Sequence, residues 1–512
     1  MSAGIGNWGG GYVTDIAYLP GYYRHQSPLH LNLACLLGGV AGIDIGPDTR
    51  LTCLELGCGQ GFGALMLAAC NPAWQVFGVD FNPAHIAAAR DLAAEAGIAN
   101  AQFLEADVAA VNDDPAWRDL PEADVVTLHG LWSWVGDGAR AGIVRVLGEK
   151  LRPGGIAYVS YNALPAWQGA LGMQRLLLEA GTRAGGSSDR QVAAGWELVR
   201  TLAAAKAAHL NDSSLVQALT QRGERTHLAY LAHEYMNAAW RPCFHADVVR
   251  ALAPAKLDWV ASAHLLENFT PLMLGEEARA ALLQSDPMIR ELVKDMFLIR
   301  SLRQDVFVRG ARRLSNVERD AALAEVMLAL QCEEAQFVWE FEVPAGQARF
   351  EREFFGPVVS ALAAAPQRVD ALLGLPGLPR RDNPGELVGM LVGSQQALPV
   401  LGPPTAPDPH VQRLNRAAAK RFLRPDNFDI GMALATSGTG SPLPCAMLDV
   451  YIADRLQTDG MTAAASWARD LGPGQPPEEL ARLREFIERV LAERAPVWRR
   501  LGVLPPAAAA AM

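Results

Sequence analysis

Several features that would mark other classes of protein are scarce in this sequence. Its 512 residues include only seven cysteines. Apart from Cys53, Cys58 and Cys70 these lie far apart, so neither a disulfide framework nor a paired zinc motif is expected. No stretch approaches about 18 consecutive apolar residues, which argues against a membrane-spanning helix, and no basic start precedes an apolar run as in a secretory leader. We therefore expect a reduced, cytoplasmic protein.

Positive charge is also in short supply. The chain has 45 Lys and Arg against 55 Asp and Glu, a formal net charge of −10. Affinity for nucleic acid depends on clustered cations, so no nucleic-acid partner is expected. Two Arg-rich stretches, 309–313 and 418–425, are interpreted as solvated helix faces. Hydrophobic residues make up 50% of the chain, which is typical of a folded globular protein.

Short apolar runs and helical stretches alternate in the first third of the chain. The apolar runs lie at 51–56, 74–79, 124–128 and 156–160, and Ala-rich helical stretches lie at 83–96 and 139–151. Alternation of this kind predicts a parallel sheet with helices on both faces. The expected fold class is α/β, with a doubly wound, Rossmann-like domain.

The rest of the sequence predicts a change of architecture. Beyond residue 164 long helical stretches carry few strand signals, and a Pro- and Gly-rich stretch at 373–409 predicts a linker or an exposed loop, with a boundary near 380–410. The last segment predicts a small helical or winged-helix module. The expected domains are an N-terminal capping segment at 1–28, the α/β domain at 29–165, a mainly helical region at 166–395 and the C-terminal module at 410–505.

A glycine-rich segment, LTCLELGCGQGFG, follows the first expected strand. It places Gly57, Gly59, Gly61 and Gly63 immediately before an expected helix. Glycine adopts positive φ easily and lets a ligand approach the backbone. A dinucleotide fingerprint would need its third glycine where this chain has Phe62, so the pattern disfavours NAD.

An acidic residue stands at each of the first three expected strand ends. Glu55 precedes the glycines and suits the ammonium of a bound amino acid. Asp80, 19 positions after Gly61, suits the two hydroxyls of a ribose, and Asp107 suits the amine of an adenine. Because open α/β sheets bind ligands beyond the carboxyl ends of their strands, all three acids are expected to line one cofactor.

This constellation resembles the class I S-adenosylmethionine-dependent methyltransferases over residues 45–165. The resemblance implies S-adenosyl-L-methionine as the cofactor and no metal. The residues expected to bind the cofactor are Tyr12, Tyr22, Glu55, Gly57, Gly59, Gly61, Asp80, Phe81, Asp107, Val108 and His129.

Two further segments, DVVTLHGLWSWV at 124–135 and YVSYNALPAW at 158–167, narrow the resemblance. They resemble bacterial methyltransferases that carry a methyltransferase regulatory domain, a group that includes lysine methyltransferases acting on bacterial outer-membrane proteins. The segments 230–248 and 433–444 resemble later parts of the same group. The resemblance therefore extends over nearly the whole chain.

Methyl transfer requires positioning of the acceptor and a neutral nucleophile. Aromatic faces stabilise cations, which suggests roles near the reacting atoms for Trp132, Trp134 and Tyr161. Asn162 would hold the acceptor amine through its carbonyl, and His129 would act as a base or as a hydrogen-bond partner. The expected catalytic residues are His129, Trp134, Tyr161 and Asn162. The alternatives are a structural hydrogen bond for His129 and core packing for the tryptophans.

Two other features leave alternatives open. Tyr12, Tyr22 and Tyr23 either cover the bound cofactor as a lid or pack on the edge of the sheet. His233 and Glu234 lie on an expected helix, but their spacing is not that of a zinc motif.

The leading hypothesis for function is methylation of lysine side chains in a protein substrate, because the resemblance points to protein-modifying enzymes. A first alternative is a small-molecule or natural-product methyltransferase. A second is a regulator that binds the cofactor without turnover. A homodimer is a further hypothesis.

Overall fold

The computed structural model describes residues 12–13, 15, 20–211, 217, 228–379, 383–424, 427–459 and 463–505. Most of the expected capping segment 1–28 lies outside these residues. One of the helical stretches that the sequence predicts beyond residue 164 covers residues 214–221, and all of it except residue 217 also lies outside them. In the described part of the chain, no helix has both the length and the apolar character of a membrane span.

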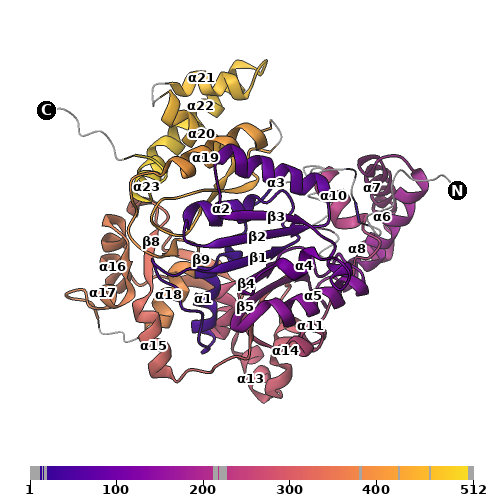
Figure 1. Cartoon of the computed structure of the whole chain (residues 1–512), viewed down its shortest axis with the longest axis horizontal. Helices are drawn as coiled ribbons and strands as arrows, with labels where there is room; N and C mark the ends of the chain where they lie inside the picture. The colour runs from indigo at the N-terminus through magenta and orange to yellow at the C-terminus, as the bar shows by residue number, and fades with distance from the viewer. Residues whose placement is uncertain are drawn as a thin grey trace.

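A seven-stranded sheet in the order β3-β2-β1-β4-β5-β7-β6 runs through the middle of the molecule (Figure 1). Neighbours among β1 to β5 pair in parallel, whereas β7 is antiparallel to both β5 and β6. The strands are β1 (Thr52–Leu56), β2 (Gln75–Asp80), β3 (Ala101–Glu105), β4 (Ala123–Leu128), β5 (Leu151–Asn162), β6 (Leu257–Ser262) and β7 (Leu302–Arg309). The doubly wound α/β fold expected from the sequence is confirmed.

Helices cover both faces of the sheet because successive side chains of a strand point to opposite sides. In β1, Cys53 belongs to one buried cluster and Leu54 to the other. α2 and α3 pack on the first face and α5 on the second (Figure 1). The helices of this part are α1 (Pro28–Leu37), α2 (Phe62–Cys70), α3 (Pro83–Ala96), α4 (Ala116–Asp119) and α5 (Asp137–Lys150).

Local signals fix the ends of α3. Asn82 caps its first turn by accepting a hydrogen bond from the Ala84 N–H at 2.9 Å, and Pro83 occupies the first helical position, where no N–H is needed. Gly97 ends the helix in the left-handed conformation at φ 68°. The residues just before this helix are thereby held at the end of β2.

A small helical layer lies beside one end of the sheet, at the right of Figure 1. α6, α7 and α10 share a separate buried cluster that includes Trp167, Leu177 and Trp196. The helices of this part are α6 (Leu171–Ala184), α7 (Ser188–Ala204), α8 (Ala208–Asn211), α10 (Leu228–Tyr235) and α11 (His245–Leu252). This layer agrees with the helical stretches expected after residue 164.

The expectation of few strands after residue 164 is wrong for β6 and β7. Both strands lie in the region expected to be mainly helical, yet they complete the central sheet. β7 carries Arg303 and Asp305, which are buried and paired with each other at 3.0 Å. A sequence pattern does not show that two charged residues are paired. Because unpaired charges are almost never buried, Arg303 and Asp305 made this segment look exposed and hid the strand.

The linker expected at 373–409 is also wrong for much of its length. α18 (Pro384–Gly393) and β12 (Ala397–Val400) lie there, and Leu387, Val388 and Leu391 are fully buried. The run of Pro and Gly reflects turns between short elements. The other elements before the C-terminal region are α12 (Thr270–Met273), α13 (Glu276–Gln284), α14 (Arg290–Phe297), α15 (Asn316–Glu325), β8 (Met327–Leu330), β9 (Glu340–Val343), β10 (Gly346–Arg349), α16 (Arg352–Ala364), β11 (Gln367–Arg368) and α17 (Val369–Leu373).

The C-terminal region is helical and packs directly on the α/β domain. Phe422 of α19 meets Phe62 of α2 with ring centroids 5.6 Å apart, and Arg413 donates to the Ala96 carbonyl at 3.0 Å. One buried cluster runs from α1 to Leu504. Its elements are α19 (Pro409–Phe422), β13 (Gly431–Leu434), β14 (Leu443–Ala446), α20 (Met447–Thr458), α21 (Ala464–Leu471), α22 (Pro477–Glu493) and α23 (Ala495–Arg500).

Candidate active site

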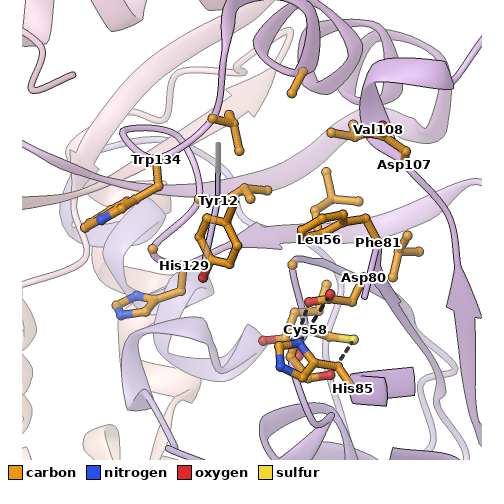
Figure 2. A pocket seen from close by; sticks show the side chains of 18 of the residues that line it. Tyr12, Leu56, Cys58, Asp80, Phe81, His85, Asp107, Val108, His129 and Trp134 are labelled. Carbon is orange, nitrogen blue, oxygen red and sulfur yellow. Dashed lines mark hydrogen bonds and ion pairs between the residues drawn. The ribbon is translucent and has the colours of Figure 1, made fainter. Parts of the chain in front are cut away.

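A cavity of about 430 Å³ opens beyond the carboxyl ends of β1, β2 and β4 (Figure 2). This is where the strand order of the sheet changes direction, the usual place for a ligand in an open α/β sheet. Ten of the residues expected at the site line this cavity. They are Tyr12, Glu55, Gly57, Gly59, Asp80, Phe81, Asp107, Val108, His129 and Trp134.

The glycine-rich turn brings backbone to the floor of the cavity. Gly57 and Gly59 have φ angles of 72° and 52°, which residues with side chains rarely adopt. A Cβ at Gly59 would meet no other atom within 4 Å, so its backbone faces open space. Gly61 does not line the cavity, and a Cβ there would lie 2.5 Å from the Phe103 ring. The expected cofactor contact of Gly61 is therefore not seen, and this glycine instead allows α2 to pack closely against β3.

Asp80 is held rigidly at the end of β2. Its carboxylate accepts hydrogen bonds from the N–H groups of Gly59 and Asn82, each at 2.9 Å. His85 of α3 lies 3.4 Å from the same carboxylate. These contacts fix both oxygens while leaving lone pairs for a diol, because a carboxylate offers about four acceptor sites. Asp80 is placed to hold a ribose, as its position in the sequence predicts.

Glu55 is a buried carboxylate that accepts hydrogen bonds from the Gln26 side chain and from the Ala64 N–H at the start of α2. Burial raises the pKa of Glu55 to about 7 in spite of these bonds. Among the described residues, no Lys, Arg or His forms an ion pair with it. A buried carboxylate without a counter-charge is costly, so an ammonium group supplied by a ligand would stabilise this site.

Asp107 begins the turn after β3. Its Oδ1 accepts from the Ala109 N–H at 2.8 Å and caps a short helical turn that starts at Val108. Asp107 is exposed, and its remaining oxygen has free acceptor capacity toward the cavity that both residues line. The amine of an adenine, which donates hydrogen bonds, fits this acceptor, whereas an anion would be repelled by the Asp107 carboxylate.

His129, at the end of β4, is buried between two tyrosines. Its Nδ1 lies 2.8 Å from the Tyr158 hydroxyl, and the Tyr23 ring stacks on it with centroids 3.7 Å apart. Burial lowers the pKa of His129 to about 3. Such an imidazole is neutral and too weak a base to deprotonate an ammonium group near neutral pH. Of the two expected roles, the structure favours the hydrogen bond.

Tyr161 and Asn162, expected to be catalytic, do not line the cavity. The Tyr161 hydroxyl donates to the buried carboxylate of Asp305 on β7. The Asn162 Oδ1 accepts from the Trp240 indole at 2.8 Å. Both side chains are almost fully buried in these contacts. Their expected roles at the acceptor are replaced by roles in holding β5 to its neighbours.

Tyr22 also lies outside the cavity. Its side chain is 9% exposed and joins the main buried cluster, while its backbone N–H donates to the Gly431 carbonyl at 3.2 Å. Tyr23, the next residue, lines the cavity instead. Trp132 is 2% exposed in the core, so the packing alternative applies to Trp132 and the cavity role to Trp134.

Tyr12 reaches into the middle of the cavity (Figure 2). Its ring meets Phe81 edge-on at 5.8 Å and His233 at 5.6 Å. This placement agrees with the expected lid better than with packing on the sheet edge.

Further lining residues carry polar groups that the sequence did not assign to the cofactor or acceptor. They include Gln26, Gln60, His85, His233 and Glu234. His85 follows Asp80 within one turn of α3, a spacing visible in the sequence. Glu234 was visible as an isolated acid on an apolar helix, but only the fold shows that this helix reaches the cavity.

Known proteins share both parts of this architecture. Family models match a methyltransferase domain over residues 53–155 and a predicted methyltransferase regulatory domain over residues 227–309. The uncharacterized protein sll1526 of Synechocystis is 32% identical over 360 residues, 70% of either chain. The uncharacterized protein RP028 of Rickettsia prowazekii is 30% identical over 157 residues, 30% of this chain and 58% of that one.

Solved structures agree in fold. The structure of PKMT2 from Rickettsia typhi in complex with AdoHcy matches with a TM-score of 0.66 at 17% identity, over 95% of this chain and 99% of that one. A second PKMT2 structure matches with a TM-score of 0.64 at 16% identity. The fold shared with PKMT2 therefore extends over 95% of this chain, well beyond the methyltransferase domain.

The fold and the cavity together define a class I S-adenosylmethionine-dependent methyltransferase. Within that class, the chain belongs to the family of methyltransferases that carry a predicted methyltransferase regulatory domain. S-adenosylmethionine is its cofactor, and the buried, uncompensated Glu55 fits the cofactor's ammonium group. When bound, the cofactor supplies a methyl group on a sulfonium.

Proposed function

We propose that the chain transfers the methyl group of S-adenosylmethionine to lysine side chains of a protein substrate. The observation that carries this proposal is a pair of aromatic residues, Tyr12 and Trp134, that line the cavity, with the Tyr12 ring in its middle (Figure 2). Aromatic faces attract cations by about 0.5–2 kcal/mol. A lysine side chain is a long apolar stem with a cationic tip, which suits this combination of rings.

The neutral state of His129 fits the same function. Tyr23 covers one face of its ring, and Tyr158 engages Nδ1. Since burial keeps the pKa of this imidazole at about 3, it adds no positive charge that would repel an ammonium group. The site is therefore compatible with a cationic acceptor next to a sulfonium.

The comparison with PKMT2 supports a similar use of the accessory regions. The fold match to PKMT2 covers 95% of this chain, whereas the family model of the methyltransferase domain covers only residues 53–155. The helical and C-terminal regions lie outside the part of the chain that the methyltransferase model covers. Together with the HGLWSWV and SYNALPAW segments, they favour a macromolecular substrate.

Purified full-length protein is incubated with radiolabelled S-adenosylmethionine and a bacterial lysate separated into proteins, nucleic acids and small molecules. We expect label in protein bands, stable to mild base and located on lysine by mass spectrometry. Label confined to the small-molecule fraction would support a natural-product methyltransferase instead. Binding of the cofactor with no label in any fraction would support a regulator.

A further inference from the structure

One acid in the cavity has no role in holding the cofactor. Glu234 lies on α10, far along the chain from the strand ends, within the region that matches the regulatory domain. It lines the same cavity as Glu55 and Asp80. Those two carboxylates accept backbone and side-chain hydrogen bonds that fix them toward the cofactor.

Glu234 is linked by its surroundings to Tyr12 and to the loop that carries Trp134. Asp80 and Glu234 both lie close enough to Tyr12 for their charges to raise the pKa of its hydroxyl, and the Tyr12 ring lies 5.6 Å from the ring of His233, the residue before Glu234. Asn237, in the turn after α10, donates to the Trp134 carbonyl at 2.6 Å. The segment that carries Glu234 is therefore tied to the loop after β4 that presents Trp134.

Glu234 also lacks a counter-charge. Within the described ranges, no Lys, Arg or His forms an ion pair with its carboxylate. A carboxylate in a cavity with aromatic walls is stabilised when a cationic ligand arrives. Tyr12, Trp134 and this acid line the same cavity.

We propose that Glu234 is the carboxylate that receives the acceptor's ammonium group and takes one of its protons. This inference rests on the proposed function and adds the residue that selects an amine. The proton passes from nitrogen to the Glu234 carboxylate, and the nitrogen lone pair then forms the N–C bond to the methyl group. The C–S bond breaks with its electron pair going to sulfur, which becomes a neutral thioether. Glu234 then releases its proton to water.

The protonation of Glu234 suits this role. Burial raises the pKa of its carboxyl group to about 8, and a base works best when its pKa lies near the working pH. The titratable groups around it are Tyr12 and Tyr23 from the N-terminal segment, His233 on the same helix, and Glu55, Asp80, Asp107 and His129 at the strand ends, with Cys58 and His85 beside the glycine turn.

The test compares the full-length wild-type protein with Glu234→Gln, which keeps the shape and removes the base. Label transfer from S-adenosylmethionine to the lysate proteins is measured from pH 6.5 to 9.5, and cofactor affinity is measured separately by calorimetry. We expect transfer by the variant to fall about a hundredfold, with cofactor affinity within about twofold of the wild-type value. At S-adenosylmethionine concentrations that saturate both proteins at every pH, the rise in wild-type rate centred near the pKa of about 8 should be absent from the variant.

A matched control is Glu276→Gln, an exposed acid on α13, which should leave both measurements unchanged. Lysine labelling by Glu234→Gln at the wild-type rate and with the wild-type pH profile would overturn the inference and leave the proposed function standing. Label on amines other than lysine that is lost in Glu234→Gln would overturn the proposed function and keep the inference. Label only on oxygen or carbon acceptors, or no label, would overturn both.

Discussion

The two walls of the cavity are built in opposite ways. The cofactor wall comes from one segment, residues 55–108, in which each strand ends in an acid. The acceptor wall comes from Tyr12, Trp134 and Glu234, which are distant in sequence and meet only in the folded chain. A site assembled within one segment leaves a motif that can be found by spacing, whereas a site assembled across the fold does not.

The walls also differ in how their acids are held. Asp80 accepts two backbone hydrogen bonds, and Glu55 accepts one from the backbone and one from Gln26. Glu234 stands on a short helix of the regulatory domain. We infer that the cofactor wall is preorganised and that the acceptor wall depends on how the regulatory domain docks.

The largest expected change in cofactor affinity follows from a substitution in the cofactor wall. Asp80→Ala should weaken S-adenosylmethionine binding at least tenfold, because charged hydrogen bonds to the ribose contribute about 1.5–3 kcal/mol each. Calorimetry measures the dissociation constant, and Asp91→Ala, an exposed acid on α3, is the control. Equal affinity in Asp80→Ala and wild type would show that the ribose lies elsewhere.

A pH series sharpens the role of Glu55. Its pKa is raised to about 7, so the carboxylate that attracts the cofactor's ammonium group is present above pH 7 and is lost as the pH falls below it. Affinity for S-adenosylmethionine should be about tenfold weaker at pH 6 than at pH 8, since one pH unit below a pKa leaves roughly a tenth of the group ionised. Glu55→Gln should bind weakly with little pH dependence. A steep dependence retained in that variant would assign the titration to another group.

A substitution in the acceptor wall should lower methyl transfer and leave cofactor affinity nearly unchanged. Trp134→Ala is expected to lower kcat/KM for the protein acceptor about tenfold, because a cation–π contact and its aromatic surface are lost. Cofactor affinity should stay within about twofold. Trp134→Phe keeps a ring and should recover part of the activity. A parallel loss of transfer and of cofactor binding would indicate that Trp134 supports the cofactor wall as packing.

The smallest effect on transfer is expected at Tyr161. Since its hydroxyl bonds to Asp305 and not to the cavity, Tyr161→Phe should change the transfer rate by less than about threefold. The free energy of unfolding should fall by about 1–3 kcal/mol, because a buried carboxylate loses a donor. Denaturant unfolding and the label assay measure the two quantities. A loss of transfer with unchanged stability would return Tyr161 to the active site.

The sequence predicted which acids line the cavity, because their signals are local. Glu55, Asp80 and Asp107 each follow an apolar run that forms a strand, and parallel strands bring such residues to one edge. The same reasoning failed for Tyr161 and Asn162. Near the end of a strand the direction of a side chain depends on its neighbours, and β7, which buries Tyr161, was not recognised as a strand.

The two errors of fold have a common cause. β7 was missed because Arg303 and Asp305 interrupt its apolar pattern, although the two charges pair with each other inside the sheet. α18 was missed because Pro384 and nearby glycines suggested a loop. In both places tertiary contacts override the local pattern. Pro384 stands at the first position of its helix, where proline is tolerated, so the signal marked a helix start and not a linker.

The position of β7 has a consequence for how the chain is made. This strand lies between β5 and β6 in the sheet, yet it leaves the ribosome 140 residues after β5 ends at Asn162. At synthesis rates of about 5–20 residues per second, the nascent chain carries the completed glycine turn for roughly 7–30 s before the edge of β5 finds its partner. During that interval the unpaired edge of β5 is open to pairing with other chains.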